Sequence, residues 1–169
     1  MTDTSQTPTL DLPDGVEVSG ELKPGYEQIL TRQALELVAI LHRDLEPRRQ
    51  QRLTARAEVV RAVANGQDLD FLPETAHLRE DETWRVAEHA PGLVDRRVEM
   101  TGPTDRKMTI NAMNSGARVW LADQEDANTP MWANVVEGPM NLRDAVAGTI
   151  SFTSPEGKDY ALKTTDQSQ

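Results

Sequence analysis

The chain has 169 residues, of which 28 are acidic and 18 basic, so its formal net charge is −10 at neutral pH. This charge repels nucleic-acid phosphates and anionic lipid headgroups, and we expect neither nucleic acid nor a membrane as a partner. The absence of cysteine excludes disulfides, thiolate metal sites and a cysteine nucleophile. Hydrophobic residues make up 37% and aromatic residues 4%, which is low for a compact domain and indicates disordered ends or a core completed elsewhere.

The chain shows no pattern of a secretory signal or of a membrane helix. Its first 15 residues are polar and lack the basic and apolar stretches of a secretory signal. No stretch approaches the roughly 20 apolar residues that a membrane helix needs. We therefore expect a soluble, cytoplasmic protein.

The first half of the chain predicts helices. Residues 1–22 show no apolar period and are expected to form a flexible arm. Apolar residues at helical spacing then predict a helix over 25–45, which Pro47 ends or interrupts, and a second over 47–64 that stops at Asn65-Gly66. The two helices are expected to form a hairpin.

The next region predicts a change from helices to a strand–helix–strand unit. Residues 68–95 are expected to be a connector with a short helical piece at 75–82. A strand at 96–100 and a helix at 105–114, capped by Thr104, follow. The apolar run at 117–122 predicts a strand covered on both faces, which completes a parallel βαβ unit.

The last region predicts a turn, a helix and a hairpin. After a polar turn at 123–129, residues 130–148 have helical segments that are interrupted at Gly138-Pro139. Short apolar runs at 150–152 and 160–162 flank Ser-Pro-Glu-Gly and predict a β-hairpin. Residues 163–169 are polar, and we expect them to be frayed.

Three carboxylates follow the second predicted strand, at Asp123, Glu125 and Asp126. Ligands of parallel α/β sheets bind at the carboxyl ends of the strands, and clustered carboxylates suit Mg²⁺ or the water around it. Acidic residues also favour solvated turns before helices, so both interpretations stay open. The three histidines are scattered and show no metal-ligand spacing.

Residues 96–144 resemble the malate synthase A family along their whole length. The family's motifs occur in order: the TGP turn at 101–103, the DRKM helix start, the NSGA turn, the acidic strand end and the NLxDA helix. The resemblance extends back through WRVAEHAPGLVD and forward to GKDY. One departure is Gln124, where the family usually carries phenylalanine.

The resemblance implies an α/β fold in which a helical N-terminal clasp precedes a TIM (β/α)₈ barrel. By this criterion residues 1–22 are the arm, 23–95 the clasp with its connector, and 96–169 the start of a truncated barrel. Two strands of eight cannot close a barrel, and their open edges leave backbone groups unpaired. We therefore expect the isolated chain to be an N-terminal fragment of low stability.

The resemblance also implies an acyltransferase activity of the glyoxylate bypass, beside the tricarboxylic acid cycle. The family condenses acetyl-CoA with glyoxylate and hydrolyses malyl-CoA to malate and CoA, with Mg²⁺ as cofactor. Its catalytic arginine, metal ligands and aspartate base match nothing before Gln169. The resemblance thus assigns no catalytic and no metal-binding residue to this chain, and the fragment alone is expected to be inactive. It implies no particular oligomeric state.

In this framework Glu125 and Asp126, beside Asp123, are candidates to orient metal-bound water near the barrel mouth. Two other interpretations remain. The chain could be a non-catalytic truncated barrel module for binding or assembly, or it could come from a related acyl-CoA lyase of the citrate-lyase β-subunit kind.

Overall fold

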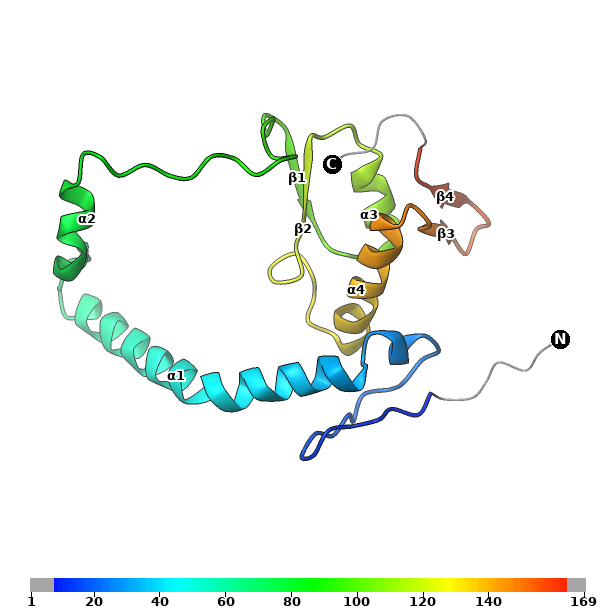
Figure 1. The fold of residues 1–169 in the computed structure, drawn as a ribbon, viewed down its shortest axis with the longest axis horizontal. Helices are drawn as coiled ribbons and strands as arrows, with labels where there is room; N and C mark the ends of the chain where they lie inside the picture. The colour runs from blue at the N-terminus through cyan, green and yellow to red at the C-terminus, as the bar shows by residue number, and fades with distance from the viewer. Residues whose placement is uncertain (1–7, 164–169) are drawn as a thin grey trace. The chain divides into compact units, whose positions relative to one another are not determined.

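The structure is a computed structural model that describes residues 8–163. The chain divides into two compact units, coloured along the chain in Figure 1. One unit comprises the residues up to Leu35 together with those from His89 onward, and the other is Glu36–Glu88. The first seven residues of the predicted arm and residues 164–169 of the predicted frayed end lie outside the described range.

A single long helix, α1, runs from Arg32 to Ala64. It is preceded by a short 3₁₀ turn, η1 (Tyr26–Gln28), so it begins later than the sequence predicted. The Thr31 hydroxyl accepts a hydrogen bond from the Ala34 N–H at 3.2 Å, which satisfies one free donor of the first turn. The expected stop is confirmed: Gly66 has φ +92°, and Gln67 N–H bonds to Ala62 C=O at 3.0 Å.

The predicted helical hairpin is wrong, because α1 continues through Pro47. Proline removes one intrahelical hydrogen bond and bends a helix, but it does not have to end it when good helix formers flank it. The Glu46 carboxylate also accepts hydrogen bonds from Arg49 and Gln50, which supports the turn around the proline. Figure 1 shows α1 bending near its middle.

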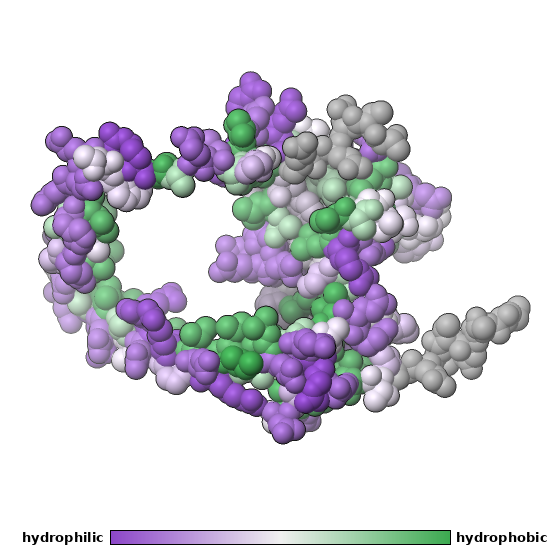
Figure 2. All heavy atoms as spheres, in the orientation of Figure 1, coloured by the Kyte–Doolittle hydropathy of each residue, from purple (hydrophilic) through white to green (hydrophobic). Residues whose placement is uncertain are grey.

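The connector after α1 holds two short pieces, η2 (Pro73–Thr75) and α2 (Ala76–Glu80). This confirms the predicted helical piece, although it is shorter than expected. Between Glu36 and Glu88 only Ala39 is buried. Large aliphatic side chains of this unit, such as Val38 and Val60, are about 60% exposed, and Figure 2 shows green apolar atoms along it.

The predicted βαβ unit is confirmed. Strand β1 (Glu99–Gly102), helix α3 (Arg106–Met113) and strand β2 (Val119–Ala122) follow in order, and β1 pairs with β2 in parallel. The helix cap is Asp105, whose carboxylate accepts a hydrogen bond from Met108 N–H at 3.0 Å. The predicted cap at Thr104 is therefore wrong.

Helix α4 (Trp132–Val146) is continuous, so the interruption predicted at Gly138-Pro139 is wrong. Close packing requires a glycine at position 138. A Cβ at position 138 would overlap the Thr104 hydroxyl, so only glycine lets α4 come this close to the β1–α3 loop. Pro139 costs the helix one backbone hydrogen bond, but the helix continues because its contacts on either side of the proline are kept.

The C-terminal hairpin is confirmed. Strands β3 (Ser151–Thr153) and β4 (Asp159–Ala161) pair antiparallel, and Gly157 in the loop has φ +80°. The hairpin packs on α3 and α4 around a small core. That core contains Ile110, Ala145 and Ile150, with Met113, Phe152, Tyr160 and Leu162 against it.

The fold is thus mixed α/β with a helical N-terminal region. The two-stranded parallel sheet is only partly covered by the described residues, since Leu121 of β2 is 51% exposed. The sequence predicted that both faces of β2 would be covered, but within residues 8–163 one face of this strand stays partly exposed. No helix among the described residues is long and apolar enough to cross a membrane.

Candidate functional site

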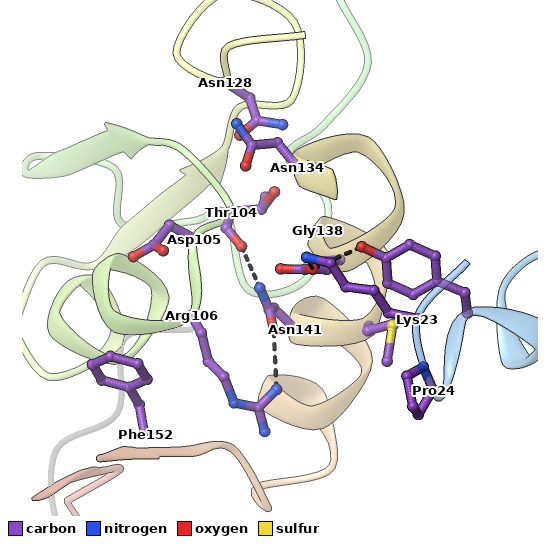
Figure 3. A pocket seen from close by; sticks show the side chains of 13 residues that line it. Lys23, Pro24, Thr104, Asp105, Arg106, Asn128, Asn134, Gly138, Asn141 and Phe152 are labelled. Carbon is purple, nitrogen blue, oxygen red and sulfur yellow. Dashed lines mark hydrogen bonds and ion pairs between the residues drawn. The ribbon is translucent and has the colours of Figure 1, made fainter. Parts of the chain in front are cut away.

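A cavity of about 330 Å³ lies beside the carboxyl ends of β1 and β2 (Figure 3). Its walls come from the loops that follow the two strands, from α4, from the hairpin and from the segment before α1. Parallel sheets place ligands at this edge, so the cavity is the first candidate for a site. Its polar lining residues are Lys23, Tyr26, Thr104, Asp105, Arg106, Asn128, Asn134, Glu137 and Asn141.

Arg106, at the start of α3, joins three elements. Its guanidinium donates to the Ser151 carbonyl at 2.7 Å, to the Asn141 amide oxygen at 3.0 Å and to the Asp144 carboxylate at 2.8 Å. The buried Asn141 then donates to the Thr104 carbonyl at 2.9 Å. Because each of the three guanidinium nitrogens donates one of these bonds, Arg106 holds α3, α4 and β3 together, and its charge is paired with Asp144.

A second polar group joins the segment before α1 to α4. One oxygen of the Glu137 carboxylate accepts a hydrogen bond from the buried Tyr26 hydroxyl at 2.7 Å and also pairs with the Lys23 ammonium at 3.0 Å. Burial and the neighbouring carboxylate raise the pKa of Tyr26. Burial acts to raise the pKa of Glu137, but the two donors outweigh it and lower that pKa.

The pairing with α4 extends along the segment on both sides of Tyr26. The Trp132 indole N–H donates to the Glu21 carbonyl at 2.8 Å, and Arg143 donates to the Gln28 amide oxygen at 2.9 Å. Part of the arm expected at residues 1–22 therefore makes specific contacts in the described structure. These contacts fix the wall that the segment contributes to the cavity.

Two buried side chains on the cavity wall have polar atoms without a partner among the described residues. They are the Thr104 hydroxyl, in a residue that is 1% exposed, and the Asn128 amide nitrogen, in a residue that is 5% exposed. Thr104 comes from the loop after β1 and Asn128 from the loop after β2. Buried polar atoms are normally hydrogen-bonded, so both atoms call for a partner.

The predicted acidic group lies outside this cavity. The Asp123 carboxylate accepts backbone hydrogen bonds from Glu125 and Asp126 at 2.9 Å and from Ala127 at 3.1 Å. These donors, with Asp126 the largest cause, lower the pKa of Asp123. Asp123 therefore shapes the turn after β2, while the Glu125 and Asp126 side chains are exposed.

The described residues do not form a site for Mg²⁺. No group of three or more histidine, aspartate or glutamate side chains within residues 8–163 is placed to hold a metal ion. Asp123 uses both carboxylate oxygens for backbone donors, which leaves them poorly placed for a cation. Any Mg²⁺ of the complete protein would need ligands from elsewhere.

The predicted site and the cavity lie at the same edge of the sheet, but none of the three predicted carboxylates lines the cavity. Thr104 was expected to cap a helix, and its burial carries no signal in the sequence. The pairing of Lys23 and Tyr26 with Glu137 joins residues more than 100 positions apart, so no spacing pattern could reveal it. The DRKM and NLxDA motifs, which contain Asp105, Arg106 and Asn141, were the available pointers.

Comparison with known proteins identifies relatives over nearly the whole chain. Residues 14–77 match the family described as "Malate synthase, N-terminal domain". The chain is 55% identical over 148 residues to a malate synthase of Myxococcus xanthus, and this match covers 88% of the chain and 27% of that relative. A malate synthase of Streptomyces clavuligerus is 51% identical over 147 residues (86% and 27%). A glyoxysomal malate synthase of Candida tropicalis is 47% identical over 154 residues (91% and 28%). The chain thus spans about a quarter of the length of these relatives.

Proposed function

The chain is a relative of malate synthases, and we propose that it forms the N-terminal part of an enzyme with that activity. The enzyme would condense acetyl-CoA with glyoxylate and hydrolyse malyl-CoA to malate and CoA. The observation that carries the proposal is the identity of 47–55% to three malate synthases over 86–91% of the chain. Such identity over about 150 residues supports a common fold and a common role for this segment.

The proposal includes the architecture of the complete protein. Residues 23–95 would be a helical clasp and its connector, residues 1–22 an arm, and residues 96–169 the start of a TIM barrel. The parallel unit β1–α3–β2 supports this assignment, because a (β/α)₈ barrel is a repetition of such units. The catalytic residues and the ligands of Mg²⁺ would lie in the part of the protein that this chain does not include.

Two experiments test the proposal. The coding sequence should continue in frame beyond Gln169 and encode further strands, the first of which bears an arginine at its carboxyl end. The complete protein should release CoA thiol from acetyl-CoA only when glyoxylate is present, whereas other aldehydes and keto acids should give no release. Thiol release with a different acceptor would indicate a related acyl-CoA lyase, and an immediate stop codon would indicate a non-catalytic module.

We also propose a cytoplasmic location, on the basis of the acidic, cysteine-free composition. The relative from Candida tropicalis is named glyoxysomal, so an organelle is the competing location. Fractionation of the source cells distinguishes the two.

The exposed carboxylate of Glu125 is proposed to orient water near the barrel mouth. Replacing Glu125 by Gln in the complete protein should lower kcat with little change in Tm, because this exposed side chain makes no hydrogen bond or ion pair with the described residues. Asp123→Asn is the contrasting variant. It weakens the carboxylate that accepts three backbone donors, so it should lower Tm. An unchanged kcat for Glu125→Gln would reject the role.

A further inference from the structure

Three arginines form a row on the second half of α1. Arg48, Arg52 and Arg56 follow one another at intervals of four residues, which places them on one side of the helix. All three side chains are exposed, and none makes a hydrogen bond or ion pair with the described residues. We call these three residues the arginine row.

Arg52, in the middle of the row, lies among charges of its own sign. Its helical neighbours three and four residues away are the other two members of the row, Arg49 and Ala55. Arg49 is paired with Glu46, and no acidic residue occupies a position from which it could pair with Arg52 along the helix. Like charges four residues apart destabilise a helix, so the row lowers the stability of α1 unless anionic groups from outside the helix compensate it.

The arginine row interrupts an apolar stripe. Leu41 and Leu45 precede the row and Val59 and Val63 follow it, each three or four residues from the next member of the series. Residues at this spacing share one face of an amphipathic helix. The four aliphatic side chains are 43–52% exposed. A surface that matches this face is therefore apolar at its two ends and acidic at its centre.

The charges argue against other covers for this face. A second copy that laid its α1 antiparallel along the stripe, centred on the row, would bring arginines against arginines. Nucleic acid and anionic lipid would be attracted to the row, but the chain as a whole carries a net charge of −10 and repels both. A protein surface with carboxylates remains. The match to this chain covers only 27–28% of the three relatives, so most of their length lies outside it.

We propose that a carboxylate-bearing surface of the complete protein, from the part beyond Gln169, covers this face of α1 and pairs with the arginine row. Its apolar side chains pack on the aliphatic residues at the two ends of the stripe. Arginine suits this role, because its guanidinium binds carboxylates in a fixed geometry while its stem packs on apolar surface. The inference rests on the proposal that the chain is the N-terminal part of a longer enzyme.

The test compares lysine with methionine at position 52 of the complete protein. The two side chains have similar helix propensities and differ in charge. If carboxylates face the row, Arg52→Met leaves them without their central cation, so Arg52→Lys should have the higher Tm. If the row faces solvent or an apolar cover, Arg52→Met relieves the repulsion from Arg48 and Arg56 and should have a Tm at least as high as that of Arg52→Lys.

Position 57 provides the matched control. Ala57 is exposed and lies off the face of the row, with Arg61 four residues away and no acidic residue three or four residues away. Ala57→Lys and Ala57→Met introduce the same two side chains there. A general benefit of positive charge in an acidic protein would favour lysine equally at both positions. The proposal predicts a larger Tm advantage of lysine over methionine at position 52 than at position 57.

A crystal structure of the complete protein gives the direct readout. Asp or Glu carboxylate oxygens from beyond Gln169 within about 4 Å of the Arg52 guanidinium support the proposal. A row that faces solvent, a small anion, a second copy or carboxylates of residues 1–169 would overturn it, as would equal advantages of lysine at positions 52 and 57. Neither readout measures catalysis, so a failure of the proposed activity in the assay of CoA release is distinguishable from a failure of this inference.

Discussion

Tyr26 is the largest fully buried side chain in the described structure, and its hydroxyl donates a hydrogen bond to the Glu137 carboxylate. This contact differs in kind from the neighbouring ion pair, although both reach the same Glu137 oxygen. The Lys23 and Glu137 side chains are 46% and 42% exposed, so water screens their attraction. The buried tyrosine hydroxyl has no comparable access to water. The hydrogen bond should therefore stabilise the fold more than the ion pair does.

Replacing Tyr26 by Phe is expected to cost about 1.5–3 kcal/mol in the free energy of unfolding, since it removes a hydrogen bond to a charged group. Replacing Lys23 by Met should cost less than about 1 kcal/mol, because it removes a screened surface pair. Urea denaturation of the complete protein measures both. Tyr160→Phe serves as the control, because no hydrogen bond of its hydroxyl occurs among the described residues, and it should be close to neutral. Equal losses for Tyr26→Phe and Lys23→Met would contradict the argument.

At the scale of elements, short sequence patterns predicted those features that depend on residues close together in the chain. The parallel β1–α3–β2 unit, the β3–β4 hairpin and the helix stop at Gly66 all follow from short-range signals, and the structure confirms them. The breaks predicted at Pro47 and Pro139 are wrong for a shared reason. A proline costs a helix one hydrogen bond, and whether the helix continues depends on its neighbours and its packing.

The close approach of α4 to the β1–α3 loop gives a prediction about Gly138. Alanine is a better helix former than glycine by about 1 kcal/mol, so replacing an exposed glycine by alanine would stabilise a helix. Here the added Cβ would overlap the Thr104 hydroxyl and come within 3.2 Å of the Gln124 amide oxygen. We expect Gly138→Ala to destabilise the complete protein by about 1–3 kcal/mol in urea denaturation.

A double variant identifies the cause of that loss. Thr104→Ala removes the overlapping hydroxyl and leaves the nearest atom of residue 104, its Cβ, at 3.4 Å from the new methyl group. The double variant Gly138→Ala with Thr104→Ala should therefore be more stable than the sum of the two single changes predicts. Additive losses would place the strain elsewhere. The Gln124 side chain also reaches this part of α4, since its amide oxygen would lie 3.2 Å from the same methyl group.

At the scale of the whole molecule, the two units differ in how much they bury. The unit that contains α3, α4 and the hairpin has a core around Ile110, Ala145 and Ile150. The unit Glu36–Glu88 buries only Ala39, although it contains most of a 33-residue helix. Helices in water owe most of their stability to packing, so this unit lacks the tertiary packing that would stabilise its helix. Nothing in the sequence distinguished the two, because apolar residues occur in both.

This difference predicts how the 169-residue chain behaves when it is expressed alone. Backbone amides of Glu36–Glu88 should exchange with deuterium fast, because few buried contacts resist their opening, whereas those of α3 and α4 should exchange more slowly. Heating should give a broad loss of circular dichroism, since helix without packing melts gradually. In the complete protein the amides of α1 should become protected if the remaining three quarters of the length cover its aliphatic side chains. A sharp transition of the monomeric chain, with uniform protection across both units, would show that the exposed surface of α1 needs no cover.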